Sequence, residues 1–266
     1  MNHLLQHFGF SHHPFARSTP KEAMFRHRGF EEAGSRLRSS AELDSIALLV
    51  ADAGCGKSLL LGDLADQLRT LGWVVLYCAH ASTGPFGLIN VLARKIGQAP
   101  RRSRAETAQA LSEALITSER KYLLVIDEAH LMPDGTLEDL RLLTIADFDR
   151  KSPFLLLLCG QPPLEERLAE APHRALDQRI STVARLAPLS LEETQKYIAV
   201  RLAAAGVKKS PLFEDGALEA IFDDSAGVPR RINNCATAAL IGAAIHGRRM
   251  VSAEDCHDAR VDRGRS

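Results

Sequence analysis

Up to Leu186, short apolar runs alternate with longer stretches in which apolar residues recur at spacings of three and four. The runs predict buried strands, and the longer stretches predict amphipathic helices, as Leu60, Leu64 and Leu68 do after the first run. Strands separated by helices imply right-handed crossovers and a mainly parallel sheet that is covered on both faces. The sequence therefore predicts an α/β core of about five strands, at residues 45–51, 73–79, 122–127, 154–159 and 182–186.

The strand pattern stops near Pro188, and the remainder of the chain has helical periodicity. Ser190 and Glu193 have the spacing of a capping box, which predicts a helix that runs to Gly206. Further helical patterns follow at 217–225, at 230–246 and after Ser252. This part of the chain is therefore expected to be a small all-helical domain.

The first residues form an aromatic segment that carries Phe8, Phe10 and Phe15 among several histidines. We expect this arm to pack on the core rather than remain free, because aromatic side chains gain from burial. The predicted organisation is an N-terminal arm at 1–24, an α/β core at 25–188 and a helical lid domain at 189–266.

The composition is that of an ordinary globular protein, with 45% hydrophobic and 25% charged residues. The 33 Lys and Arg balance the 33 Asp and Glu, so binding to nucleic acid or anionic lipid would need a local patch. No apolar run approaches the roughly 20 residues that span a bilayer, and the pattern of a secretory signal is absent. The five cysteines are scattered without a C-x-x-C pair, and we interpret them as reduced thiols of a cytoplasmic protein that has no membrane partner.

Residues 51–58 have the pattern of a phosphate-binding P-loop. They match G-x-x-x-x-G-K-[ST] except at Ala51, which stands in place of the first glycine. Small residues let backbone N–H groups surround a phosphate, and the start of the following helix adds a positive dipole end. Lys57 would reach the β- and γ-phosphates, and the Ser58 hydroxyl would bind Mg²⁺. The predicted nucleotide contacts are Asp52, Ala53, Gly54, Cys55, Gly56, Lys57, Ser58 and Leu59.

Two carboxylates, Asp127 and Glu128, end the third predicted strand. A buried parallel strand delivers its last residues to the carboxyl edge of the sheet, where ligands bind. Asp127 is therefore predicted to hold Mg²⁺, directly or through water, and Glu128 to orient and activate the attacking water. Residues 127–130 also spell the D-E-A-H box of a helicase superfamily. Such helicases need two nucleotide-binding halves, whereas this sequence contains one.

Together these motifs resemble the AAA+ ATPases of the ExeA, TniB and TnsC type, which are related to the origin-recognition and MuB-like ATPases. The resemblance covers nearly the whole chain and includes, beyond the two motifs above, segments at 7–10, 14–15, 158–162, 178–180, 189–202 and 227–233. It implies a P-loop αβα sandwich with a five-stranded, mainly parallel sheet and a small all-helical lid. It also implies that the protein binds ATP and Mg²⁺ and hydrolyses ATP.

The resemblance assigns further roles to three polar residues. Arg230, at the start of a lid helix, would contact the γ-phosphate as the sensor-2 arginine. Arg179, just before the fifth strand, would be the arginine finger that reaches the nucleotide of a neighbouring subunit, with Arg174 as its rival. Gln161 occupies the sensor-1 position, where many AAA+ proteins have Asn, Thr or Asp.

Two readings of the N-terminal aromatic segment stay open. Phe10, Pro14 and Phe15 would either help to enclose the adenine, as the arm does in related proteins, or pack in the core. The histidines lack convergent partners in the sequence, so no zinc site is predicted.

The partner decides what such an ATPase does, and the resemblance leaves two functions. In the first, ATP-dependent homo-oligomers, rings or filaments, form on duplex DNA and recruit a transposase. In the second, the chain is the ATPase module of an ExeA-like protein of type II secretion. The secretion proteins continue into a membrane span and a peptidoglycan-binding part, and the sequence ends at Ser266, which favours transposition. Arg101, Arg102 and Arg104 are the candidate DNA contacts.

Overall fold

The computed structural model describes residues 2–16, 24–42, 46–79, 85–145, 152–207 and 211–262. Its contacts divide the chain into two compact units, residues 28–186 and residues 1–27 with 187–266. We call the first the sheet unit and the second the helical unit. The arm and the lid domain, which the sequence analysis listed separately, belong to the same compact unit.

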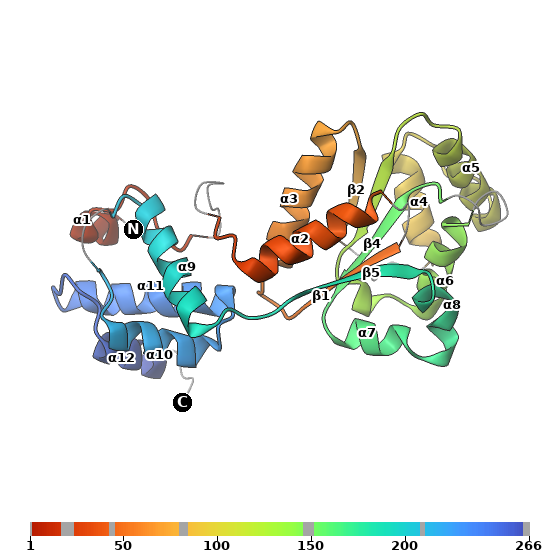
Figure 1. Cartoon of the computed structure of the whole chain (residues 1–266). Helices are drawn as coiled ribbons and strands as arrows, with labels where there is room; N and C mark the ends of the chain where they lie inside the picture. The colour runs from red at the N-terminus through yellow and green to blue at the C-terminus, as the bar shows by residue number, and fades with distance from the viewer. Residues whose placement is uncertain are drawn as a thin grey trace. The chain divides into compact units, whose positions relative to one another are not determined.

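The sheet unit is built on five parallel strands in the order β2-β3-β4-β1-β5 (Figure 1). Their bounds are β1 Ile46–Ala51, β2 Val74–Cys78, β3 Tyr122–Ile126, β4 Leu155–Gly160 and β5 Ile180–Leu186. Every residue of β1 and β4 is buried, which explains why these strands are continuous apolar runs rather than alternating ones. The predicted fold class, an α/β sandwich with a five-stranded parallel sheet, is confirmed.

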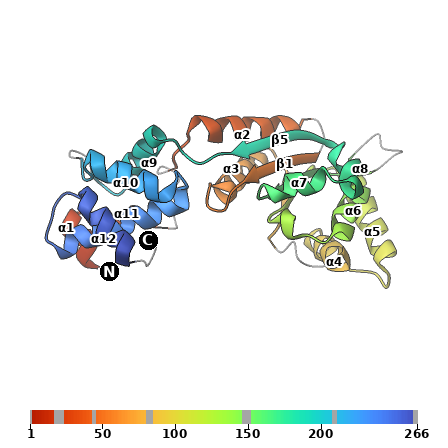
Figure 2. The same cartoon turned by 90° about the horizontal axis from the view of Figure 1, so that it is seen from below.

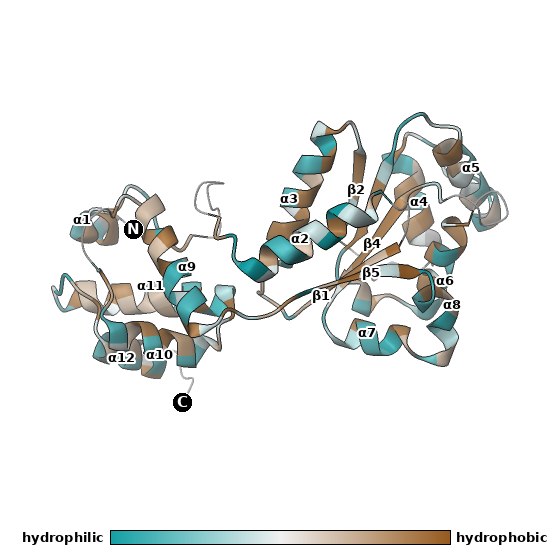
Figure 3. Cartoon of the chain, in the orientation of Figure 1, coloured by the Kyte–Doolittle hydropathy of each residue, from teal (hydrophilic) through white to brown (hydrophobic). Residues whose placement is uncertain are grey.

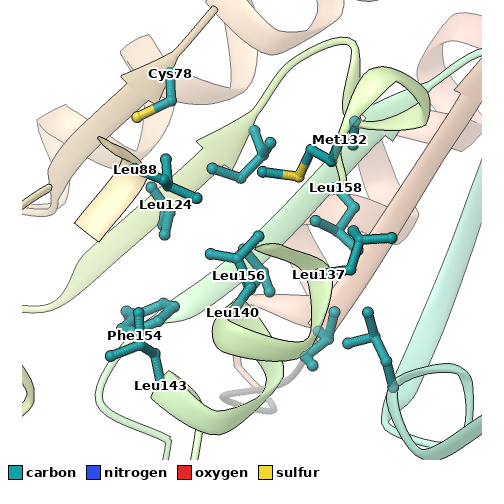
Figure 4. Close-up of a cluster of buried hydrophobic side chains, with 14 of the residues drawn as sticks. Cys78, Leu88, Leu124, Met132, Leu137, Leu140, Leu143, Phe154, Leu156 and Leu158 are labelled. Carbon is teal, nitrogen blue, oxygen red and sulfur yellow. The ribbon is translucent and has the colours of Figure 1, made fainter. Parts of the chain in front are cut away.

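Helices connect the strands and cover both faces of the sheet (Figure 2). They are α2 Arg28–Ser40, α3 Lys57–Thr70, α4 Pro85–Lys95, α5 Arg104–Ile116, α6 Asp134–Leu143, α7 Pro163–Leu168 and α8 Arg174–Asp177, with short 3₁₀ turns η2 Ala129–Leu131 and η4 Ala171–His173. On one face, Leu124, Leu156 and Leu158 of the strands pack against Leu137 and Leu140 of α6 (Figure 4). On the other, α2 lies along β5 and α3 contacts β1 and β2.

The helical unit contains α1 Asn2–Phe8, α9 Leu191–Ala204, α10 Asp215–Ser225, α11 Pro229–Ile245 and α12 Ala253–Asp262. The predicted capping box is present, since Ser190 Oγ accepts from Glu193 N at 3.2 Å and the Glu193 carboxylate accepts from Ser190 N at 3.0 Å. Buried apolar residues of these helices form a common core, and Figure 3 shows hydrophobic and hydrophilic residues mixed along each helix. Ile241, Ile245 and Val261 remain exposed. None of the helices in the described ranges is long and apolar enough to cross a membrane.

The N-terminal arm is built into the helical unit. Phe10 and Phe15 are 6% and 5% exposed and belong to its hydrophobic core. The buried guanidinium of Arg201 on α9 donates to the carbonyl oxygens of Pro14 and Ala16 at 2.7 and 2.8 Å. Burial of two aromatic rings and two charge-assisted hydrogen bonds therefore fix the arm.

Candidate functional site

The loop between β1 and α3 has the backbone of a phosphate cradle. Gly54 and Gly56 have φ of 94° and 101°, a region that strongly favours glycine. A Cβ added at Gly56 would meet no atom within 4 Å, so it would project into open space in the loop. In the first turn of α3, Leu59 N and Leu60 N donate to the carbonyl oxygen of Gly56 at 3.0 Å, which leaves the N–H groups of Lys57 and Ser58 as the donors of the helix start. The loop therefore has room and donors for a phosphate group.

Lys57, the first residue of α3, is only 6% exposed. Its Nζ donates to the carbonyl oxygens of Ala51 and Asp52 at 2.6 and 3.1 Å. A buried ammonium needs such acceptors, and they hold it at the carboxyl end of β1. Phosphate oxygens would be stronger acceptors for the same donor because they carry charge.

The remaining predicted loop residues differ in exposure. Asp52, Ala53, Ser58 and Leu59 are exposed. The Cys55 side chain is buried, and burial, followed by the nearby Asp52 charge, raises the pKa of its thiol. Cys55 thus contributes packing to the loop, while the Ser58 hydroxyl is free to bind a ligand.

Asp127 follows β3 and is 6% exposed. Both of its carboxylate oxygens accept hydrogen bonds, Oδ1 from Glu128 N at 2.9 Å and Oδ2 from the Tyr77 hydroxyl at 2.6 Å. Partial burial and then the hydrogen bond to Asp127 raise the pKa of Tyr77 well above its usual range, so the phenol stays protonated and remains a donor. Ser58 and Asp127 supply hydroxyl and carboxylate oxygens, the ligand types that Mg²⁺ prefers, and both fit the predicted ion.

Glu128 has φ 52° and ψ 38°, the left-handed conformation, which costs a non-glycine residue about 1–2 kcal/mol. This turn ends β3 and begins η2. Strained backbone of this kind is found at functional sites when the surroundings enforce it. The Glu128 side chain is 41% exposed, and its Oε2 lies 3.6 Å from Nδ1 of His130.

Gln161 follows β4 directly, and its Nε2 donates to Nε2 of His130 at 3.1 Å. The structure thus brings Glu128, His130 and Gln161 together. The sequence analysis had placed Glu128 and Gln161 in the site separately and did not assign a role to His130.

The carboxyl ends of three neighbouring strands carry these groups. In the sheet, Val50 of β1 pairs with Gly160 of β4, and Ile126 of β3 pairs with Leu158. The P-loop, the Asp127–Glu128 pair and Gln161 therefore follow adjacent strands at one edge (Figure 1). Cys159 is fully buried within reach of their charges, and burial, followed by the Asp127 charge, raises the pKa of its thiol. This edge combines a glycine loop with room for a phosphate group and side chains whose hydroxyl and carboxylate oxygens are of the types that Mg²⁺ prefers.

Comparisons with known proteins agree with this arrangement. A family model described as "AAA domain" matches residues 41–168. General secretion pathway protein A of Aeromonas hydrophila is 31% identical over 250 residues, which cover 91% of this chain and 45% of that protein. The chain belongs to the AAA+ family and is of the ExeA-like type. It spans less than half the length of that curated relative.

Solved structures show the same AAA+ fold. Cdc6p of Pyrobaculum aerophilum has a TM-score of 0.72 at 19% identity, with 94% of this chain and 70% of that chain covered. Drosophila ORC bound to DNA has a TM-score of 0.70 at 18% identity, with 99% and 66% covered. At these identities the likeness establishes the fold.

The two candidate finger arginines lie around α8 of this AAA+ protein. Arg174 begins α8 and is exposed. Arg179 lies between α8 and β5, is half-buried, and its Nη2 donates to the carbonyl oxygen of Thr144 at 3.4 Å. Arg179 would have to leave this carbonyl to reach a neighbouring subunit.

Arg230 is the second residue of α11 in the helical unit, and its side chain is exposed. The chain just before α11 is held tightly. Leu189 N donates to the carbonyl oxygen of Gly227 at 2.8 Å, and a Cβ at Gly227 would lie 1.9 Å from the carbonyl oxygen of Leu189. Arg230 therefore extends from a closely packed turn.

The three arginines proposed as DNA contacts differ in their surroundings. Arg101 and Arg102 are exposed before α5. Arg104 forms an ion pair with the buried Asp139 of α6, so its charge is already offset within the fold. Arg104 is accordingly a poorer phosphate contact than the other two.

Proposed function

We propose that this AAA+ protein hydrolyses ATP in a Mg²⁺-dependent reaction. The observation that supports it most is the meeting of Lys57, Asp127 and Glu128 at one edge of the sheet, beside an open glycine cradle. A structural role alone would not require a buried ammonium and a buried carboxylate at this edge, because buried charges lower stability unless they are compensated.

Each residue has a distinct part in the proposed reaction. Lys57 and the loop N–H groups would bind the β- and γ-phosphate oxygens. Ser58 and Asp127 would hold Mg²⁺, which supplies positive charge against the phosphate oxygens when it is bound. Glu128 would take a proton from the attacking water. The water oxygen would then bond to the γ-phosphorus as the bond between that phosphorus and the ADP oxygen breaks.

The direct test compares nucleotide binding with turnover. Lys57→Ala should abolish binding of a fluorescent ATP analogue, whereas Glu128→Gln should bind ATP and release almost no phosphate. Lys95→Ala removes an exposed lysine on α4 and is the matched control. Turnover of Glu128→Gln at the wild-type rate would refute the base assignment.

We also propose that ATP drives self-assembly and that the neighbouring subunit completes the site. Arg179 would act as the finger in the neighbour's site and Arg230 as the lid arginine for the γ-phosphate. A finger placed at the edge of a subunit would stabilise transition-state charge in the site of the neighbouring subunit. The position of Arg179 next to β5 and the exposure of Arg230 support these roles.

The first proposed cellular role is in DNA transposition, with duplex DNA and a transposase as partners. Its support on this chain is the exposed Arg101 and Arg102, which an oligomer would repeat many times. Among proteins of similar fold, one solved structure is described as ORC bound to DNA.

The second proposed role is in a secretion pathway, and the 31% identical General secretion pathway protein A supports it. Titration of the protein with duplex DNA, with and without ATP, distinguishes the transposition role from the secretion role. Cooperative, ATP-dependent binding would support the first role. Lack of duplex binding at low salt, together with intact ATP turnover, would leave the secretion role as the better proposal.

A further inference from the structure

His130 lies between the side chains of Gln161, at the predicted sensor-1 position, and Glu128, the predicted base. Its ring is 13% exposed, on the short turn η2 that follows Glu128. Nε2 faces the amide of Gln161 at 3.1 Å, and Nδ1 faces Oε2 of Glu128 at 3.6 Å. The imidazole therefore bridges the end of β4 and the end of β3.

With the amide nitrogen of Gln161 turned toward the ring, this contact favours one tautomer of His130. The amide nitrogen of Gln161 can only donate, so Nε2 of His130 must accept with its lone pair. In the neutral ring the proton then resides on Nδ1. The N–H group of that nitrogen faces the Glu128 carboxylate, and the opposite tautomer would turn a lone pair toward the same negative charge.

Nδ1 is shielded from solvent and has no hydrogen-bond partner among the described residues. A buried polar group that is left unpaired lowers the stability of the fold. A rotation of the exposed Glu128 side chain that shortens the 3.6 Å separation would satisfy it. A hydrogen bond from Nδ1 would thus favour one orientation of the Glu128 carboxylate.

Neighbouring groups hold the ring's backbone in place. Arg167 Nη1 donates to the carbonyl oxygen of His130 at 3.2 Å. Gly160 lies close to the same turn, since a Cβ there would be 3.4 Å from His130 N and 2.7 Å from a Leu164 methyl group. The turn that carries the ring is therefore packed against the end of β4 and against α7.

We propose that His130 is a positioning residue, through which Gln161 at the sensor-1 position orients the Glu128 carboxylate for the attacking water. This inference rests on the proposed ATPase function. It gives the side chain of Gln161, which is longer than the usual Asn or Thr, a specific task, because the amide reaches the ring rather than the water.

The kinetic test separates turnover from binding. His130→Ala should lower kcat about 10- to 100-fold, the usual effect of removing a group that orients a reacting residue, while the Kd for ATP changes less than about twofold. Gln161→Ala should lower kcat as well, and the double variant should be no worse than His130→Ala. His257→Ala, which removes an exposed histidine on α12, is the control.

A conservative variant distinguishes positioning from simple packing. The amide N–H of His130→Asn can replace Nδ1–H but not the acceptor Nε2. It should recover part of kcat and should no longer respond to Gln161→Ala. Equal kcat for the Asn and Ala variants, wild-type kcat for His130→Ala, or a loss of ATP binding that matches the loss of kcat would each overturn the proposal.

A measurement that does not depend on ATP hydrolysis tests this proposal independently of the proposed function. The ring ¹⁵N shifts of His130 at alkaline pH, where imidazole is neutral, should show the Nδ1–H tautomer in the wild type and a mixture in Gln161→Ala. The Nε2–H tautomer in the wild type would overturn the bridge even if ATP is hydrolysed. A wild-type chain with the expected tautomer that hydrolyses no ATP would instead refute the ATPase proposal.

Discussion

The Tyr77 hydroxyl on β2 donates to Oδ2 of Asp127 at 2.6 Å, in a contact that joins two neighbouring strands. Asp127 Oδ1 already accepts from the backbone of Glu128, so the carboxylate is fixed from both sides. Metal ligands are commonly oriented by hydrogen bonds of this kind. Tyr77 therefore sets the direction in which Asp127 can offer a lone pair to Mg²⁺.

Tyr77→Phe removes one hydroxyl and should raise the Mg²⁺ concentration for half-maximal ATP hydrolysis by about 10-fold or more. Binding of ATP without Mg²⁺ should not change, because the P-loop is untouched. Mg²⁺ titrations of steady-state turnover provide the measurement. Tyr122→Phe at the opposite end of β3, whose hydroxyl contacts Ser118, is the matched control. An unchanged Mg²⁺ requirement would show that Tyr77 is dispensable for the metal site.

Arg179→Ala should bind ATP with wild-type affinity and hydrolyse it at least about 100-fold more slowly, since arginine fingers contribute large rate factors. A mixture of Arg179→Ala and Lys57→Ala chains should recover part of the activity, because one chain supplies the finger and the other the nucleotide site. Arg174→Ala in parallel tests the rival. Full activity of Arg179→Ala, or of isolated monomers, would contradict a shared site.

Charge reversal of Arg101 and Arg102 to Glu should weaken ATP-dependent duplex binding and lower the salt slope by about 1 per lost phosphate contact. ATP binding should stay intact. Arg104→Glu is a different experiment, because it places a carboxylate next to the buried Asp139 and should lower the urea midpoint. Identical salt slopes for wild type and the Arg101/Arg102 variant would exclude these two residues as DNA contacts.

Gly227→Ala should destabilise the helical unit by at least about 2 kcal/mol, because the new Cβ would overlap the Leu189 carbonyl and the φ of 71° disfavours alanine. Ala226 also has a left-handed φ, of 50°, so Ala226→Gly should leave stability within about 1 kcal/mol of wild type. Urea unfolding followed by circular dichroism compares the two. Equal urea midpoints for the two variants would mean that the turn adapts to the extra methyl group of Gly227→Ala.

The sequence predicted the elements whose signals are local. The strands β1, β3 and β4 are apolar because both faces of the sheet are covered, so their burial can be predicted from their residue types. The P-loop could also be predicted, because its glycines and Lys57 are contiguous in the sequence and glycine is required by the backbone conformation of the loop.

Contacts between strands could not be predicted, because they depend on the strand order β2-β3-β4-β1-β5. Tyr77 meets Asp127, and Gln161 meets His130, across sequence separations that carry no local signal. In the sequence, Arg104 belongs to a basic cluster, whereas in the structure it forms an ion pair with Asp139 of α6. The predicted roles of Arg179 and Arg230 depend on a neighbouring subunit or on bound nucleotide.

The helical unit is discontinuous in the chain, since residues 1–27 and 187–266 build it and the sheet unit lies between them. On the ribosome, the sheet unit can therefore fold as soon as β5 has emerged. Phe10 and Phe15, by contrast, are made early and must wait for α9 to α12 before their rings are covered. The burial of these two rings therefore belongs to the last step of folding, when the second part of the helical unit has been made.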